Sequence, residues 1–217
     1  MKKIFIPALA LLAIASGITA FRSASTETAA AQPAYPLSTT ATKWNVDKGH
    51  SNVKFSVTHM VVAETEGYFK IFEGSMENTK PDYSDAKINF TVDVTSINTD
   101  NENRDKHLKS DDFFNAEKFP QMKFESTSFQ PQGGNKYKLN GNLTIRDVTK
   151  PITFDVTYGG ELKTSRGTTI GFKAAGTVNR FDYGLKWDRA TETGGLVVGK
   201  DVDIIVKLEM RQVPPQP

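Results

Sequence analysis

The sequence predicts an all-β domain, and two observations carry that prediction. Apolar residues occupy alternate positions in six segments between residues 53 and 210, which is the pattern of strands that bury one face. Turn-forming residues such as Gly133-Gly134 and Gly159-Gly160 separate neighbouring segments at the spacing of hairpins. About eight or nine strands connected in this way indicate an antiparallel barrel or an antiparallel sandwich.

The predicted strands differ in length. The six alternating segments are residues 53–59, 86–94, 137–145, 152–158, 170–178 and 202–210, and shorter candidates are residues 43–46, 67–75 and 122–129. Their inward positions mix large side chains with small ones, namely Phe55, Phe90, Phe154 and Phe172 with Gly141, Ala174 and Gly176. This mixture favours the barrel, because a tapered or hollow interior needs both sizes. An eight-stranded barrel is just wide enough to hold one small ligand.

The amino-terminal residues predict export. Residues 1–20 combine Lys2 and Lys3, an apolar run over 4–15 and small residues up to Ala20, as in a secretory signal peptide, and the run is short for a membrane anchor. Residues 21–42 are rich in Ala, Ser, Thr and Pro, which predicts a flexible linker. We therefore expect a periplasmic or secreted domain over 43–211 with a short tail at 212–217, and no stable membrane insertion once the signal is removed.

Composition excludes several classes of protein. The 217 residues suit one sizeable domain besides the leader. The 27 Lys and Arg residues and 25 Asp and Glu residues become equal in number without Lys2 and Lys3, so the net charge gives no electrostatic case for binding nucleic acid or an anionic membrane surface. Cysteine is absent, which excludes disulfides, thiolate metal ligands and a cysteine nucleophile.

The sequence shows no catalytic or metal-binding motif. It has no G-x-S-x-G, no phosphate-binding glycine loop and no dinucleotide fingerprint. The only histidines, His50, His59 and His107, match no local metal motif and have no compact cluster of carboxylates beside them in the sequence. We predict structural roles for them, with His59 pointing inward as a polar group, and we expect no enzyme activity and no cofactor other than a bound lipid or quinone. Asp111-Asp112 is typical of a solvated helix or turn boundary.

Residues 180–184, Arg-Phe-Asp-Tyr-Gly, predict a corner of the barrel. A buried or half-buried arginine usually has a structural partner. We therefore expect Arg180 to bind backbone carbonyls or Asp182 while Phe181 closes the end of the barrel.

Several short motifs occur in a fixed order along the chain. They are Trp44-Asn45-Val46-Asp47, His50-Ser51, Val53-Lys54-Phe55 with His59, Gly67-Tyr68-Phe69, Phe72-Glu73-Gly74, Arg104-Asp105-Lys106-His107-Leu108, Asp112-Phe113-Phe114-Asn115, Phe119-Pro120, Gly141-Asn142-Leu143-Thr144-Ile145, Val148-Thr149-Lys150-Pro151 and Asn179-Arg180-Phe181-Asp182-Tyr183-Gly184. In this order the chain resembles the YceI-like family of lipocalin-like, polyisoprenoid-binding proteins over about residues 43–210.

The resemblance implies an eight-stranded antiparallel lipocalin-like barrel, exported in many bacteria and often a homodimer, with a long isoprenoid-type chain inside. One departure is Asp147, where the family usually has glycine. Because Asp tolerates left-handed backbone conformations, we expect the turn to be kept. Lys186-Trp187 matches no pattern with an assigned role.

The segment 98–124 breaks the alternation of the strands. Residues 101–110 suit a short helix, with Glu102 in its first turn and basic residues in its last. Leu108, Phe113 and Phe114 supply an apolar side. We predict a short helix and long loop that cover one open end of the barrel as a lid.

The leading hypothesis is an exported protein that sequesters or carries a polyprenyl or quinone-like chain inside the barrel, where burial of apolar surface supplies the binding energy. The predicted ligand-binding residues are Phe55, Val57, His59, Ile88, Phe90, Val92, Leu108, Phe113, Phe114, Leu143, Ile145, Phe154 and Phe172. For each apolar residue among them the alternative is simple packing of the barrel core. Two other functions stay open, an enzyme acting on an isoprenoid or quinone through His59 or His107, and a structural or stress-response protein with an incidental cavity.

Overall fold

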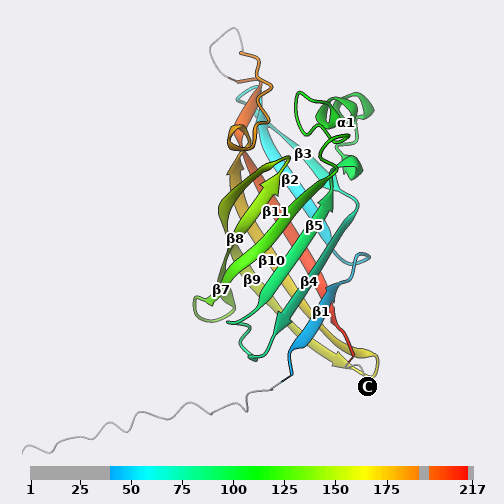
Figure 1. Cartoon of the computed structure of the whole chain (residues 1–217), viewed down its shortest axis with the longest axis vertical. Coiled ribbons are helices and arrows are strands. Elements are labelled where there is room, and N and C mark those ends of the chain that lie inside the picture. The colour runs from blue at the N-terminus through cyan, green and yellow to red at the C-terminus, as the bar shows by residue number, and fades with distance from the viewer. Residues whose placement is uncertain (1–39, 191–195, 215–217) are drawn as a thin grey trace, which may run out of the picture. The chain divides into compact units, whose positions relative to one another are not determined.

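The computed structural model describes residues 40–190 and 196–214, and their backbone forms one antiparallel β-sheet that closes on itself (Figure 1). The elements in chain order are β1 (Thr42–Val46), β2 (Asn52–His59), β3 (Ala63–Phe69), β4 (Phe72–Asn78), β5 (Lys87–Asp93), η1 (Val94–Ser96), β6 (Ile97–Asn98), α1 (Glu102–Lys109), β7 (Gln121–Pro131), β8 (Lys136–Ile145), β9 (Val148–Thr164), β10 (Gly167–Asn179), η2 (Arg180–Tyr183) and β11 (Val198–Gln212).

The ring of strands is a barrel and not a sandwich. Hydrogen-bonded neighbours follow the order β1-β4-β5-β7-β8-β9-β10-β11, and β11 pairs back to β1. These eight strands close the barrel, as the sequence predicts. Strand β2 pairs with the first part of β11 and with β3, and β3 pairs with β6. The pairing of Trp44–Val46 with Met210–Gln212 therefore closes the barrel at one end, and the β2–β3 hairpin and β6 continue its wall towards the other.

The small residues in the wall have a different cause from the tapering expected from the sequence. A Cβ atom added to Gly141 would overlap the ring of Phe124 and lie 2.5 Å from the carbonyl oxygen of Glu125. A Cβ atom added to Gly176 would lie 2.7 Å from the ring of Phe154. Contacts this short are forbidden to real side chains, so these glycines let a phenylalanine ring from the neighbouring strand lie flat against the backbone.

One end of the barrel is closed by aromatic side chains. This aromatic plug consists of Trp44, Tyr83, Phe129, Tyr137, Tyr158 and Phe172. The indole N–H of Trp44 donates to Oδ1 of Asn78 at 2.8 Å. Burial and a hydrogen bond with Tyr158 raise the pKa of the Tyr83 phenol far above its usual range. The phenol therefore stays neutral, and this end of the barrel is sealed by packed, uncharged rings.

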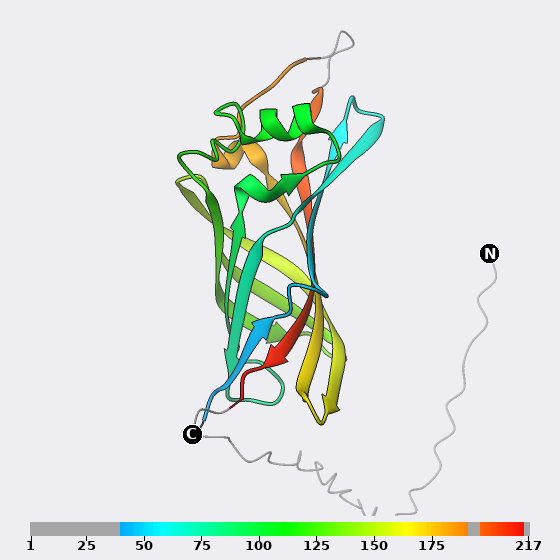
Figure 2. The ribbon, with the colours of Figure 1, turned by 90° about the vertical axis from the view of Figure 1, so that its right-hand side faces the viewer.

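The lid, defined as residues 99–119, covers the opposite end (Figure 2). Helix α1 occupies nearly the predicted range, and Oδ1 of Asn101 accepts a hydrogen bond from the backbone N–H of Arg104 at 3.0 Å as its N-cap. The side chain of Asp105 is buried and accepts hydrogen bonds from both the N–H and the hydroxyl of Thr99, at 2.9 and 2.6 Å. Arg104 in turn donates to the hydroxyl and carbonyl of Thr99. These bonds hold the first turn of α1 against Thr99, the residue that follows β6.

Arg180 and Arg146 make further hydrogen bonds at the lidded end of the barrel. Arg180 is buried and donates to four backbone carbonyls, at 2.7–2.9 Å; they belong to Leu185, Trp187, Val198 and Gly199. The sequence predicted backbone carbonyls or Asp182 as partners of Arg180, and the structure shows the carbonyls. Arg146 lies in the two-residue turn between β8 and β9 and donates to the carbonyls of Phe113 and Gly184, each at 3.2 Å.

The turn between β8 and β9 is kept, as expected, but Asp147 is not its left-handed residue. The left-handed residue is Arg146, with φ of 57°, and Asp147 is not among the residues with positive φ. The reason is the set of hydrogen bonds that Arg146 makes to the lid, which places its side chain over Phe119 and holds the strained backbone.

Candidate ligand-binding cavity

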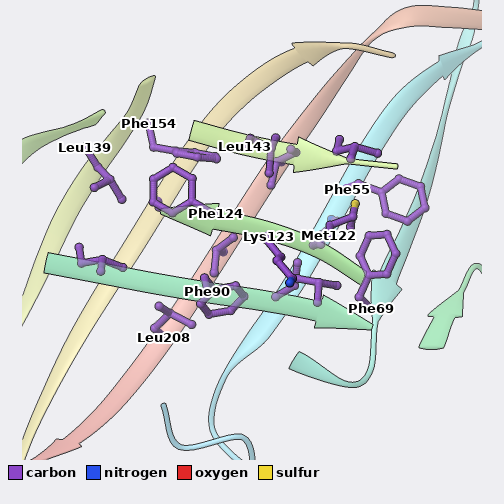
Figure 3. A pocket seen from close by; sticks show the side chains of 18 residues that line it. Phe55, Phe69, Phe90, Met122, Lys123, Phe124, Leu139, Leu143, Phe154 and Leu208 are labelled. Carbon is purple, nitrogen blue, oxygen red and sulfur yellow. The ribbon is translucent and has the colours of Figure 1, made fainter. Parts of the chain in front are cut away.

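The barrel contains an apolar cavity of about 120 Å³, here called the inner cavity (Figure 3). Its wall comes mainly from the inward positions of eight strands, in which large apolar side chains alternate with outward polar ones. The lining residues are Val53, Lys54, Phe55, Phe69, Ile88, Phe90, Val92, Met122, Lys123, Phe124, Leu139, Leu143, Ile145, Phe154, Ala174, Ile204, Val206 and Leu208. The two lysines belong to positions that alternate with the inward ones, and Lys54 pairs with Glu66.

A second cavity of about 100 Å³, the lid cavity, lies between the inner cavity and the lid. Its lining residues are Phe55, Val57, Phe69, Leu108, Phe113, Phe114, Met122, Ile145, Val178, Arg180, Leu185, Val198, Val202 and Ile204. Five of these also line the inner cavity: Phe55, Phe69, Met122, Ile145 and Ile204. The two spaces therefore follow one another along the barrel axis, separated by side chains that they share.

A third space, the rim pocket of about 370 Å³, is more polar than the two cavities. It is lined by Phe55, Val57, His59, Thr65, Thr99, Asn103, Arg104, His107, Leu108, Phe113, Trp187, Val197 and Val198. Phe55, Val57, Leu108, Phe113 and Val198 are shared with the lid cavity. These five apolar side chains border both spaces.

Most of the predicted ligand-binding residues line the inner cavity or the lid cavity. Phe55, Ile88, Phe90, Val92, Leu143, Ile145 and Phe154 line the inner cavity, and Val57, Leu108, Phe113 and Phe114 line the lid cavity.

Two predicted residues lie elsewhere. Phe172 belongs to the aromatic plug, where its ring centroid is 5.3 Å from that of Tyr158. His59 is exposed at the end of β2 and borders the rim pocket, so the expectation that it points into the barrel is wrong. The alternation of β2 continues through His59, but the hairpin has left the barrel wall by this point.

Sequence reasoning missed part of the wall. Ile204, Val206 and Leu208 lie in a segment recognised as a strand, and only the closure of β11 against β2 shows that they face the cavity. Phe69 and Met122 separate the two cavities, yet they come from the shorter strand candidates, whose alternation is weak.

The charged groups near the cavities are committed to structural contacts. Burial lowers the pKa of the Arg180 guanidinium, and the negative charge of Asp188 partly offsets this effect. Arg180 donates to the four carbonyls named above, and its charge is held without a bonded carboxylate among the described residues. His107 lies at the rim, with Nε2 2.8 Å from Oδ2 of Asp112 and its ring edge-on to Phe113 and Trp187.

A carboxylate and histidine cluster does form on the outside of the barrel, contrary to the sequence-based expectation. Asp47, His50 and Glu209 place ligand atoms within 4.8 Å of one another. Nδ1 of His50 is 3.1 Å from Oδ2 of Asp47, and this hydrogen bond holds the Asp47 pKa below its usual value. A guanidinium nitrogen of Arg211 is 2.6 Å from the same oxygen. The cluster cannot be recognised in the sequence, because Glu209 lies near the other end of the chain from Asp47 and His50. In the structure, Arg211 already neutralises the charge of Asp47.

Together these features define a closed antiparallel β-barrel with an apolar interior, one plugged end and one lidded end. The YceI-like domain family model matches residues 44–210, and the chain belongs to this family. UPF0312 protein SA2479 of Staphylococcus aureus (strain N315) is 39% identical over 163 residues, which cover 74% of this chain and 92% of that protein.

Solved structures show the same fold. The YceI protein of Campylobacter jejuni is 31% identical with a TM-score of 0.62, covering 78% of this chain and 97% of that one. BcnA of Burkholderia cenocepacia is 27% identical with a TM-score of 0.65, covering 76% and 98%. A polyisoprenoid binding domain from Saccharophagus degradans, 13% identical with a TM-score of 0.57 and covering 79% and 98%, shares the fold. Among the described residues, no helix has the length and apolar character needed to cross a bilayer.

Proposed function

We propose that this protein binds a long isoprenoid chain, of polyprenyl or quinone-like type, inside the barrel and carries or sequesters it outside the cytoplasm. The observation that carries the proposal is the pair of adjoining apolar cavities, closed by the plug at one end and by the lid at the other. The polyisoprenoid-binding domain with the same fold supports the choice of ligand class.

The size of the cavities sets a condition on binding. A cavity of about 150 Å³ holds one benzene molecule, so the inner and lid cavities each have room for about one isoprene unit. A long chain must join them, which requires the shared side chains, above all Phe55, Phe69 and Met122, to change rotamer. Methionine and ring rotations are inexpensive motions in an apolar wall. We infer that the cavities widen as the chain enters.

Binding would rest on burial at about 25 cal/mol per Å² of apolar surface, with few polar contacts. Specificity would therefore follow the length and width of the chain more than its headgroup. Because the interior carries no catalytic arrangement among the described residues, we propose a binding protein and not an enzyme. The alternative enzyme would use the rim pocket, where His59 and His107 both lie, and turnover of an isoprenoid or quinone that is lost in His59→Ala and His107→Ala would establish it.

Export belongs to the same proposal. Residues 1–39, with the predicted signal peptide and most of the predicted linker, lie outside the described residues. Fractionation of expressing cells, with the mass of the mature protein, would test the predicted signal. The homodimer implied by the resemblance is checked by light scattering of the same sample.

The direct test of ligand class is organic extraction of the purified protein followed by mass spectrometry. An isoprenoid in a roughly one-to-one ratio supports the proposal. A protein that extracts empty, and that takes up no polyprenol or quinone on incubation, contradicts it.

A further inference from the structure

The tip of the β2–β3 hairpin combines exposed apolar side chains with a strained backbone. Met60, Val61 and Val62 form the three-residue loop between His59 and Ala63, which pair with each other. Their exposed fractions are 47%, 65% and 88%, and they are three of the five large hydrophobic residues exposed in the described part of the chain. The hairpin projects at the same end of the barrel as α1 (Figure 2).

The fold itself does not explain these side chains. Met60 and Val61 have φ of 53° and 69°, a left-handed conformation that suits Gly or Asn and is a genuine outlier for a β-branched residue. A polar or glycine loop would form this hairpin with less strain and less exposed apolar surface. Because strain of this kind persists where function maintains it, the apolar side chains at the tip point to a partner.

The position of the tip indicates which partner. His59 and Thr65, from the two strands of this hairpin, line the rim pocket, and the rim pocket shares five apolar side chains with the lid cavity. The tip thus stands beside a path that leads from the rim pocket to the lid cavity. A surface that touches the tip would also face the mouth of that path.

The polar wall of the rim pocket suits an anionic, amphipathic surface. It includes Arg104, His59 and His107, with Trp187 beside them, and no carboxylate lines it among the described residues. Two acidic side chains form hydrogen bonds with its lining residues, Asp112 with His107 and Asp105 with Thr99. Arginine, histidine and tryptophan beside an apolar tip are the composition of a segment that meets the headgroup region of a bilayer.

We propose that the β2–β3 hairpin tip docks reversibly on a lipid bilayer, with Val61 and Val62 entering the headgroup region, so that an isoprenoid passes between membrane and barrel through the rim pocket. This inference rests on the proposed function for the passage of ligand, while docking itself can be measured alone. Three apolar side chains give only weak, reversible attachment, which suits a carrier that must leave the membrane again.

The first experiment reads the environment of the tip directly. Since the chain has no cysteine, Val62→Cys in the full chain can be labelled with an environment-sensitive dye and mixed with vesicles of phosphatidylethanolamine and phosphatidylglycerol. Leu162→Cys is the matched control, because Leu162 is 63% exposed and lies near the end of the β9–β10 hairpin, away from the lid. We expect a blue shift and stronger emission at position 62 only. No change at position 62, or equal changes at both, would overturn the proposal.

The second experiment measures transfer. Val61→Asn with Val62→Ser makes the tip polar, and Asn suits the left-handed backbone, so the variant should melt at the same or a higher temperature than the parent. We expect uptake of a polyprenol from donor vesicles to slow several-fold while the amount bound at equilibrium is unchanged; Leu162→Ser should behave as the parent. Equal rates in all three would contradict docking, as would a tip variant that loses self-association instead. If no protein binds polyprenol yet the dye at position 62 still shifts, the proposed function fails and docking stands.

Discussion

A guanidinium N–H of Arg146 donates to the carbonyl of Phe113 at 3.2 Å, and this bond joins the β8–β9 turn to the lid. The same nitrogen also reaches the carbonyl of Gly184, so one side chain ties together three segments that are distant in sequence. Phe113 lines the lid cavity. The position of the lid over the cavities therefore depends on Arg146, which is not part of the lid.

Replacing Arg146 tests this dependence. Arg146→Ala removes a charged donor from two carbonyls and from Asp111, and hydrogen bonds to charged groups contribute about 1.5–3 kcal/mol. We expect a lower free energy of unfolding by about that amount and faster release of a bound isoprenoid, measured by denaturant unfolding and by competition with a fluorescent lipid. Arg166→Ala, at the exposed β9–β10 turn, is the control; equal effects in both would contradict the role of Arg146.

The two lid phenylalanines, Phe113 and Phe114, differ in how deeply they are buried. Phe113 is buried against His107 and Trp187, so its loss would damage the fold as well as the lid. Phe114 is half-buried and meets Phe69 edge-on, with ring centroids 6.0 Å apart. Phe114→Ser is therefore the cleaner test of the lid.

We expect Phe114→Ser to release ligand about tenfold faster, because roughly 1.5–3 kcal/mol of apolar contact is lost on one wall of the cavity. Release is measured by stopped-flow transfer to acceptor vesicles. Unaltered release in a folded variant would mean that the segment covers the barrel without retaining the ligand.

The glycines under phenylalanine rings give a prediction on stability. Gly141→Ala should lower the free energy of unfolding by about 1–3 kcal/mol, because the new methyl group overlaps Phe124 and the backbone of Glu125. Gly171→Ala is the matched control within the sheet, since the nearest atom to its new methyl would be 3.9 Å away. Urea unfolding of the two variants measures the difference in their free energies of unfolding. Equal values would contradict the prediction and would mean that the wall is loosely packed.

The sequence predicted the strands and the lid helix more successfully than the wall of the site. Alternation identified most strands because one face of each is buried, and Asn101 with its following residues identified α1. The predicted strand 67–75 is wrong as a single strand, because it joins the end of β3 to the start of β4, and β3 itself has little apolar alternation. Contacts such as Glu209 beside His50 follow from ring closure between the two ends of the chain, which no local pattern encodes.

The hydrogen bond and ion pair of Asp47 predict that the stability of the fold decreases at acid pH. The Asp47 pKa is held below its usual value, chiefly by the hydrogen bond with His50 and also by Arg211. A carboxyl with a depressed folded-state pKa stabilises the fold above its unfolded pKa, and this stability is lost as pH falls through the folded value. Asp47→Asn should therefore flatten the loss of melting temperature below about pH 4. Asp155→Asn, exposed on β9, should leave the profile of the parent, and identical profiles in all three would rule out the contribution.

The interior of the barrel is the proposed binding site for the isoprenoid chain. Ala174 lines the inner cavity, whereas Ala175 is the next residue of β10 and faces the other way. Ala174→Leu should fill much of the inner cavity, and Ala175→Leu adds the same atoms outside. Native mass spectrometry after incubation with a polyprenol should show one lipid on the parent and on Ala175→Leu, and at least tenfold less on folded Ala174→Leu. Equal loading of the two variants would show that the chain binds elsewhere.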